Sequence, residues 1–233
     1  MQCLSAEKIL ALWEAGRPQH ALDRALTMLL AASPGTSRDD LADLSIGERD
    51  ARLLQLRHLV LGARAEGFAE CPRCAERIEF PLDTAAFAQP RELSESGHEI
   101  EVNGATVRFR LPTSRDLAET VTAPDSSRAL RILVERCAGM VDLPNETLRA
   151  ISSAMLAVDP QAEIVLNFDC PACGHDWELL FDVGEFFWTE IAAQAQRLLR
   201  EIDALARAYG WTEREILSLP AQRRQTYLEL VAA

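Results

Sequence analysis

The chain has 233 residues, of which 48% are apolar and 26% charged, a balance that excludes wholesale disorder. Its formal net charge is −12 at pH 7, which repels phosphate backbones, so we expect no direct contact with nucleic acid. We also expect no membrane span, since no uninterrupted apolar run reaches about 18 residues. The N-terminus lacks the basic start and apolar core of a signal peptide, which predicts a cytoplasmic protein. A reducing compartment favours metal binding over disulfides for the six cysteines.

The first third of the chain has the apolar spacing of helices. Three helices are expected there, from Ser5 to Gly16, from Ala21 to Leu30 and from Ser45 to Gly62. Ser45 and Glu48 form a capping-box pattern, in which a hydroxyl and a carboxylate satisfy each other's backbone donors. Together these segments predict a helical unit over residues 1–62.

The middle of the chain mixes strand and helix patterns. Arg77–Phe80 alternates like a strand, and Glu99–Phe109 contains two alternating runs around Asn103-Gly104. Asn-Gly tolerates the positive φ angles of a type I′ turn, so the second segment predicts a β-hairpin. Helical patterns follow near Ser114–Val121, Ser127–Cys137 and Asn145–Ala157.

The C-terminal quarter predicts a long helix with a heptad-like stripe. The stripe consists of Trp188, Ile191, Ala195, Leu198, Ile202, Leu205 and Tyr209. It can be internal packing or a partner surface. Gly210 would end this helix in the left-handed conformation, Thr212 and Glu215 form a capping box, and Pro220 suits the first turn of a last helix.

An internal repeat is the strongest feature of the sequence. Glu70–Phe87 aligns with Asp169–Phe186 without a gap, at a constant offset of 99 residues. The identical pairs are Cys71/Cys170, Pro72/Pro171, Cys74/Cys173, Glu79/Glu178, Asp83/Asp182 and Phe87/Phe186. We interpret each copy as a Cys-x-x-Cys turn, called a knuckle below, followed by one strand.

Zinc coordination explains why such a unit occurs twice. One knuckle presents two thiolates to an ion, and a tetrahedral site needs a second knuckle to close. The pattern therefore predicts one structural Zn²⁺ bound by Cys71, Cys74, Cys170 and Cys173. Four sulfurs leave no open position for water, so such a site stabilises the fold and catalyses nothing.

Other interpretations of the cysteines remain open. The four could be buried thiols or redox-active dithiols, although neither knuckle lies between a strand and a long helix as in thioredoxin-like proteins. Cys3 and Cys137 have no spacing partner, and Cys137 falls on an apolar helical face. His175 follows the second knuckle closely, but we expect it to lie outside the ligand set because four thiolates complete a tetrahedron.

The sequence offers no constellation for catalysis. Its four histidines are scattered, and it contains no Gly-x-Ser-x-Gly elbow and no Gly-rich phosphate loop. We therefore expect a protein that is not an enzyme. Four amphipathic aromatic residues of the C-terminal segment, which are typical interface anchors, predict a partner-binding surface: Trp188, Tyr209, Trp211 and Tyr227.

Several segments resemble the baseplate hub assembly chaperone family, which is encoded with contractile phage tails and extracellular contractile injection systems. They are Phe168–Trp177, Phe187–Ile191 and Leu205–Leu217, with Leu44–Asp50 and Phe109–Ser114 as further family patterns. The resemblance touches most of the chain and is densest from about Phe168 onward. It implies a non-enzymatic helper that binds baseplate or tail proteins and associates transiently with assembling particles.

The expected fold is α+β, in four parts. These are an N-terminal helical unit (1–62), a split zinc ribbon (63–87 and 162–186), an α/β insertion with the hairpin (88–161), and C-terminal helices (187–233). The expected function is assembly of the baseplate hub of a contractile particle. The alternatives are a zinc-ribbon adaptor of another complex, for example one linked to transcription, and a dithiol redox protein.

Overall fold

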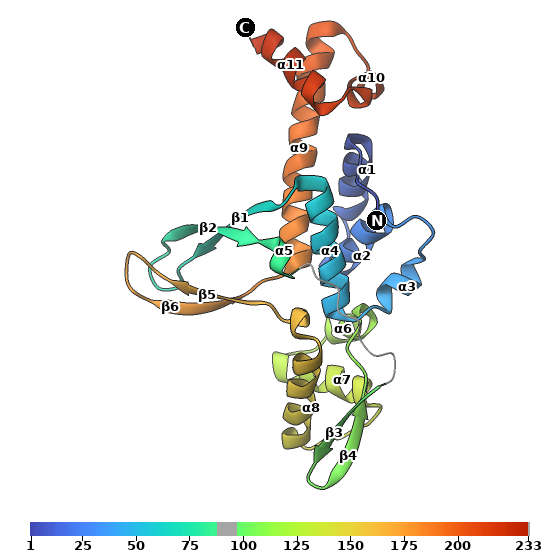
Figure 1. Ribbon diagram of the computed structural model, residues 1–233, viewed down its shortest axis with the longest axis vertical. Helices are drawn as coiled ribbons and strands as arrows, with labels where there is room; N and C mark the ends of the chain where they lie inside the picture. Colours follow the sequence, from blue (N-terminus) through green and yellow to red (C-terminus); the bar gives the residue numbers. More distant parts are fainter. Residues whose placement is uncertain (88–96, 233) are drawn as a thin grey trace.

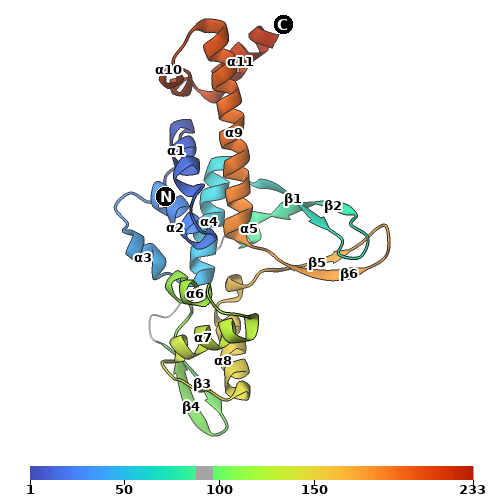
Figure 2. The same cartoon turned by 180° about the vertical axis from the view of Figure 1, so that it is seen from behind.

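The computed structural model describes residues 1–87 and 97–232. A long helix, α9 (Val183–Tyr209), forms the axis of the upper part of the molecule (Figure 1). Shorter helices pack along it, two β-hairpins project sideways from its lower end, and a separate lobe lies below them (Figures 1 and 2). We call these parts the body, the arm and the lower lobe. The α+β fold class is confirmed.

The body consists of helices with clear sequence signals. They are α1 (Ala6–Gly16), α2 (Ala21–Ala32), α3 (Arg38–Ala42), α4 (Ile46–Leu61) and α9. The Ser5 and Ser45 side chains cap α1 and α4 by accepting from backbone N–H groups. Helix α3 was not expected; Ser37 and Asp40 form a reciprocal capping box at its start.

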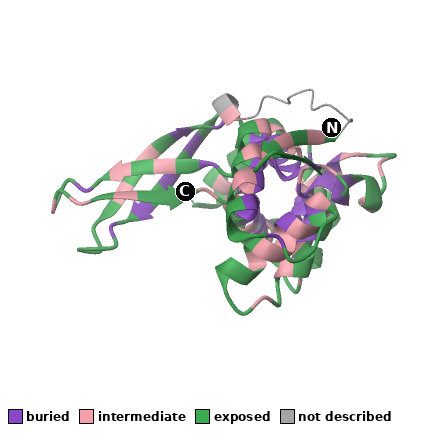
Figure 3. Cartoon of the chain, turned by 90° about the horizontal axis from the view of Figure 1, so that it is seen from below, coloured by how far each residue is buried: buried purple, intermediate pink, exposed green. Residues whose placement is uncertain are grey.

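The body has one continuous apolar core. It contains residues from all five helices, including Leu12, Leu29, Leu41, Leu54 and Phe187. Figure 3 shows buried residues gathered inside this part, whereas the hairpins are exposed or intermediate over most of their length. N-terminal helices and the C-terminal long helix therefore stabilise each other by shared apolar burial.

The heptad-like stripe of α9 is used inside the chain over most of its length. Trp188, Ile191, Ala195 and Leu198 belong to the body core, and Ile202 packs against it. A Cβ at Gly16 would lie 2.5 Å from the Trp188 ring, so only glycine permits this close approach of α1 to α9.

The arm consists of two antiparallel hairpins that are not hydrogen-bonded to each other as one sheet. One pairs β1 (Arg64–Glu70) with β2 (Arg77–Asp83), and the other pairs β5 (Val165–Asp169) with β6 (Asp176–Leu180). One strand follows each knuckle, as expected, and a second strand precedes each knuckle and pairs with it. The signal of β1 is weak because its inward residues are the small Ala65, Gly67 and Ala69.

The lower lobe carries the predicted hairpin and three helices around a second core. Its elements are β3 (His98–Val102), β4 (Ala105–Phe109), α6 (Ser114–Thr120), α7 (Ser126–Ala138), α8 (Asn145–Val158) and the 3₁₀ helix η1 (Pro160–Ala162). The type I′ turn is confirmed by φ angles of 53° at Asn103 and 78° at Gly104. The core includes Val107, Phe109 and Ile151. Residues 88–96 of the expected insertion lie outside the described residues.

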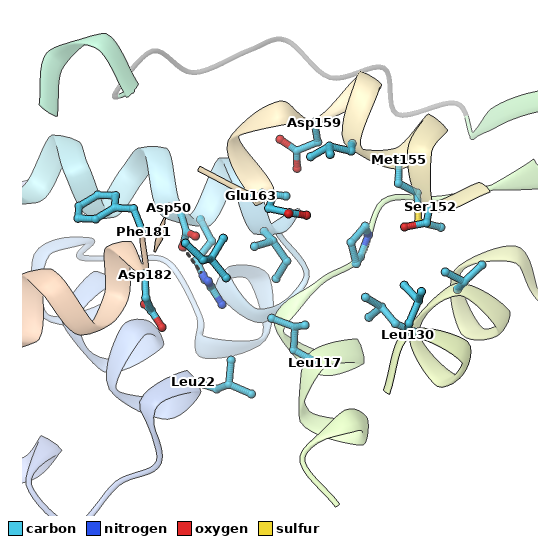
Figure 4. A pocket seen from close by; sticks show the side chains of 18 residues that line it. Leu22, Asp50, Leu117, Leu130, Ser152, Met155, Asp159, Glu163, Phe181 and Asp182 are labelled. Atoms are coloured by element: carbon cyan, nitrogen blue, oxygen red, sulfur yellow. Dashed lines mark hydrogen bonds and ion pairs between the residues drawn. The ribbon is translucent and has the colours of Figure 1, made fainter. Parts of the chain in front are cut away.

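The lower lobe is joined to the body at the start of α4. Ser45 and Thr113 form an isolated antiparallel bridge, and the buried Asp159 carboxylate accepts from the Gly47 N–H at 3.0 Å. A cavity of about 360 Å³ lies between Leu22 of the body, Met155 of the lower lobe and Phe181, which follows β6 at the base of the arm (Figure 4).

Three carboxylates that line this cavity have polar partners, and one of these contacts joins the lower lobe to the body. Asp50 pairs with Arg49 at 2.7 Å, Asp159 binds Gly47, and Asp182 caps α9 by accepting from Glu185. Burial raises the pKa of Asp50; the Arg49 charge opposes the shift.

The chain ends in two short helices beside the end of α9. These are α10 (Glu213–Ser218) and α11 (Ala221–Ala232). Gly210 has a φ of 69°, and Thr212 and Glu215 form the expected capping box. A further short helix, α5 (Thr84–Phe87), follows β2. No helix in the described part of the chain combines the length and apolar character required to cross a bilayer.

Candidate metal centre

The two knuckles lie at the tips of the two arm hairpins. Cys71–Cys74 joins β1 to β2, and Cys170–Cys173 joins β5 to β6. The flanking strand pairs have the same register, since Glu70 faces Arg77 and Asp169 faces Asp176. The sequence repeat with its offset of 99 therefore corresponds to two copies of one local structure.

The two turns also share their backbone hydrogen bonds. The Cys71 N–H donates to the Glu76 carbonyl at 2.9 Å, and the Cys170 N–H donates to the His175 carbonyl at 3.0 Å. The residue after the second cysteine is left-handed in both, with φ 59° at Ala75 and 63° at Gly174. Glycine adopts this conformation freely, whereas alanine does so at a steric cost. The Cys71–Cys74 turn thus has the same backbone conformation as the Cys170–Cys173 turn, although alanine disfavours the left-handed region that Ala75 occupies.

The four knuckle thiols form one cluster. Their sulfur atoms lie within 4.8 Å of one another, and no other residue among those described belongs to the group. Between the hairpins, the Cys71 and Cys173 sulfurs are 3.7 Å apart, and the Cys74 and Cys170 sulfurs are 3.6 Å apart. These distances exceed the roughly 2.0 Å of a disulfide bond, and all four thiols are free.

Two sulfur–sulfur distances of the cluster match those of a tetrahedral thiolate site. Zinc–sulfur bonds of about 2.3 Å place the corners of a tetrahedron about 3.8 Å apart. The two inter-hairpin distances, 3.6 and 3.7 Å, are close to that edge. The residues therefore fit a Cys₄-bound ion, and the geometry resembles a zinc ribbon.

The knuckles stabilise negative charge on one sulfur in particular. Burial opposes ionisation of Cys71, but the backbone N–H groups of Arg73 and Cys74 outweigh it and lower the pKa of this thiol to about 7. The Glu76 N–H acts in the same direction on Cys74, but the adjacent sulfurs and burial raise its pKa to about 12. Four thiols packed together cannot all ionise without a cation between them.

Aromatic rings connect the two hairpins below the cluster. Phe80 of β2 meets Phe168 of β5 edge to face, with 4.8 Å between ring centroids, and Phe168 stacks on Trp177 at 5.3 Å. Gly67 lies opposite Phe80 in the register, and a Cβ there would come within 2.5 Å of that ring. A glycine in β1 thus makes room for the ring that joins the hairpins.

The root of the arm is fixed to the body by a buried arginine. Arg57 of α4 is 2% exposed and forms two hydrogen bonds with Glu190 of α9, at 2.7 and 3.0 Å. It also donates to the carbonyls of Gly62 and Arg64, where β1 begins. We call this the root clamp. The sequence contains no signal of this clamp, because an arginine within a helix has the pattern of an exposed residue.

The remaining cysteines and His175 lie outside the cluster. Cys3 is exposed, and Cys137 is buried in the core of the lower lobe, where burial raises the pKa of its thiol to about 11. The His175 ring stacks on Trp177 with 6.3 Å between centroids.

The four predicted partner-binding residues lie in two places. Trp188 is 7% exposed and belongs to the body core. The other three form a cluster at the C-terminal end: Tyr209 stacks on Trp211 at 4.6 Å, and Tyr227 meets both rings nearly edge-on. The structure separates Trp188 from these three aromatics.

The fold and the cysteine cluster define an α+β protein with a split, ribbon-like Cys₄ site. The chain belongs to the family of T4 bacteriophage base plate proteins, whose profile matches residues 2–141. The matched part includes the body helices α1–α4, the first knuckle and most of the lower lobe. No curated protein and no solved structure gave a significant match. Family membership indicates a structural or assembly role in a phage-type baseplate.

Proposed function

We propose that the protein is a non-enzymatic assembly chaperone for the baseplate hub of a contractile phage tail-like particle, and that it binds one structural zinc ion. Family membership supports the baseplate role. The observation that supports the zinc proposal is the cluster of four sulfurs within 4.8 Å of one another, with inter-hairpin pairs at 3.6 and 3.7 Å. The protein would act in the cytoplasm, where particles assemble.

The proposed ion would be bound by Cys71, Cys74, Cys170 and Cys173. It would stabilise the fold and would not take part in catalysis, since four thiolates leave no open coordination position. Its effect on the chain would be mechanical. The two knuckles are about a hundred residues apart in sequence, and the lower lobe lies between them. Joining the hairpin tips would therefore fix the two chain segments that lead into and out of the lower lobe.

For the partner surface we propose the cluster of Tyr209, Trp211 and Tyr227. Tyr209 is 38% exposed, and the two other rings are half-buried. Aromatic rings held in a fixed arrangement are favourable interface anchors because little side-chain entropy is lost on binding. Trp188 is not part of this proposal because its ring is used in the body core.

The assembly role is tested by deleting the gene from a producing strain and examining the particles. The expected result is tubes and sheaths without a complete baseplate, with restoration by the intact gene. Quantitative mass spectrometry of purified wild-type particles then separates a chaperone, which is depleted from them, from a stoichiometric baseplate subunit. Normal particles from the deletion strain would refute the assembly role.

The aromatic surface is tested by co-purification with co-expressed hub proteins. Trp211→Ala should weaken recovery of the hub complex, whereas Trp13→Ala, a half-buried tryptophan of α1, serves as the matched control. If Trp211→Ala changes neither thermal stability nor recovery, the surface lies elsewhere.

A further inference from the structure

The lower lobe has a positively charged pocket between α7 and α8. Its volume is about 370 Å³, within the range of about 300–1,000 Å³ that is common for binding pockets. Three arginines line it, Arg128 and Arg131 from α7 and Arg149 from α8, together with Asn145, Leu130 and Leu148. We call it the α7–α8 pocket. Such a concentration of positive charge is unusual for a chain with a net charge of −12.

Two of these arginines differ from the other arginines of the lower lobe. Arg108 pairs with Glu99, Arg110 and Arg136 pair with Asp116, and Arg115 pairs with Asp39 and Asp43. Arg128 and Arg149 are exposed and form no ion pair with any described residue. Their guanidinium groups are thus available to a ligand, and they stand on the two helices that form opposite walls.

The third arginine holds the walls in place. Arg131 donates to the Asn145 side chain at 2.7 Å, to the Leu143 carbonyl at 2.8 Å and to Glu135 at 3.0 Å. These bonds join α7 to the loop and first turn of α8, so the separation of the two helices that carry Arg128 and Arg149 is set before any ligand arrives. Preorganisation of this kind lowers the entropic cost of binding.

The start of α8 adds to the positive potential. Its N-cap residue is Pro144, whose side chain offers no hydrogen bond to the first N–H groups. Uncapped N–H groups at a helix start carry partial positive charge. The apolar part of the pocket consists of Leu148, which is buried, and Leu130, which is 39% exposed.

We propose that the α7–α8 pocket binds a short acidic segment of a partner protein, with Arg128 and Arg149 pairing with carboxylates and Leu130 contacting a neighbouring apolar side chain. The guanidinium fork matches a carboxylate with two parallel hydrogen bonds. A nucleic-acid strand is the weaker candidate, because the net charge of −12 repels an extended polyanion. Two carboxylates next to an apolar side chain match the two unpaired arginines and Leu130 of the lining.

The identity of the partner as a baseplate component rests on the proposed function, but the binding itself does not. It is measured on the isolated protein by NMR, from the arginine Nε–H signals, during titration with the capped hexapeptide Glu-Leu-Glu-Glu-Leu-Glu. Saturable shifts are expected at Arg128 and Arg149, and they should weaken as salt is raised. The matched control peptide is Lys-Leu-Lys-Lys-Leu-Lys.

Two double variants complete the test. Arg128→Gln with Arg149→Gln should reduce the affinity about tenfold or more, since two charge-assisted pairs are lost. Arg214→Gln with Arg223→Gln removes two exposed arginines at the C-terminal end and should leave the affinity unchanged. Both should fold, because the substituted side chains are exposed.

Three results would overturn the proposal. They are the lack of a saturable shift at either arginine, equal affinity in the first double variant, and equal binding of the lysine peptide. Tighter binding of an oligothymidylate than of the acidic peptide would assign the pocket to nucleic acid instead. None of these outcomes bears on the gene-deletion test, so the two proposals can fail separately.

Discussion

The body and the arm of this protein are stabilised by different means. The body buries a continuous set of large apolar side chains, among them Met28, Leu53 and Phe187, which are fully buried. The strands of the arm bury few residues, namely Ala65, Gly67, Ala69 and Leu82. An isolated two-stranded hairpin is marginally stable in water. The arm therefore depends on attachments at its two ends, the cysteine cluster at the tips and the root clamp at the base.

This difference shows how a chain can extend a thin structure from a packed core. Apolar burial stabilises in proportion to area, and a narrow arm has little area to bury. A few strong, directional contacts can replace that area, provided that they are preformed and satisfied. The following predictions test this division of roles.

The largest effect is expected at the cysteine cluster. Structural zinc sites contribute on the order of 10 kcal/mol of apparent binding free energy, which is coupled to folding. Cys71→Ser and Cys170→Ser should each lose about one zinc per chain, measured by mass spectrometry of the native protein. Hydrogen exchange should become fast in β1, β2, β5 and β6 and stay slow in the body.

Cys3→Ser is the matched control, because Cys3 is an exposed thiol outside the cluster. It should retain the metal and the protection of the arm. Freshly prepared, reduced wild-type protein without metal would refute the zinc site. Other contacts would then have to stabilise the two hairpins of the arm.

The root clamp should give the next largest effect. Arg57→Met leaves Glu190 without the buried arginine that pairs with it, and breaking a buried ion pair costs about 3–5 kcal/mol. The loss should appear in the urea unfolding midpoint. Arg52→Met removes a more exposed pair with Glu48 on the same helix and should cost less than about 1 kcal/mol. Equal losses of unfolding free energy in the two variants would show that the root clamp stabilises the protein no more than an exposed ion pair does.

The joint between the body and the lower lobe should be sensitive to a single methyl group. A Cβ at Gly47 would lie 1.9 Å from an Asp159 oxygen, so Gly47→Ala must displace the buried carboxylate that binds the Gly47 N–H. We expect a loss of about 2–4 kcal/mol in urea unfolding. Gly184→Ala, at the start of α9, meets nothing closer than 3.4 Å and should be nearly neutral.

The stability of the lower lobe should depend on pH through Asp116. Burial acts to raise the pKa of Asp116, but hydrogen bonds from Arg110 and Thr113 outweigh it and hold the pKa well below the usual 3.8. A carboxyl with a lowered pKa in the folded state stabilises above its unfolded pKa, and this stabilisation is lost as the pH falls below about 3.8.

Asp116→Asn should therefore cost about 2 kcal/mol at neutral pH, with the difference from wild type shrinking under acid conditions. Urea unfolding of both proteins at neutral and acid pH measures it. Asp39→Asn, an exposed partner of Arg115, should cost less than about 1 kcal/mol. A difference for Asp116→Asn that stays constant with pH would contradict the assigned cause.

Much of the helical body and the turns could be predicted from sequence. Ser5, Ser45 and Thr212 are caps whose side chains bind neighbouring backbone N–H groups, which is a local interaction. Asn103-Gly104 and Gly210 determine their turns through their own φ angles. The stripe of α9 was visible as a period, but the sequence alone left open whether α1, α2 and α4 or a partner covers it.

The sequence by itself determined which four thiols belong together, because each Cys-x-x-Cys turn is a local pattern and its repetition is visible without the fold. The tertiary structure decided what lies around them. Strand β1, the root clamp, the Phe80–Phe168 contact and the pairing of α7 with α8 each join segments whose own residues carry no signal for it. Their free energy comes from partners far away in sequence, so only the folded chain reveals them.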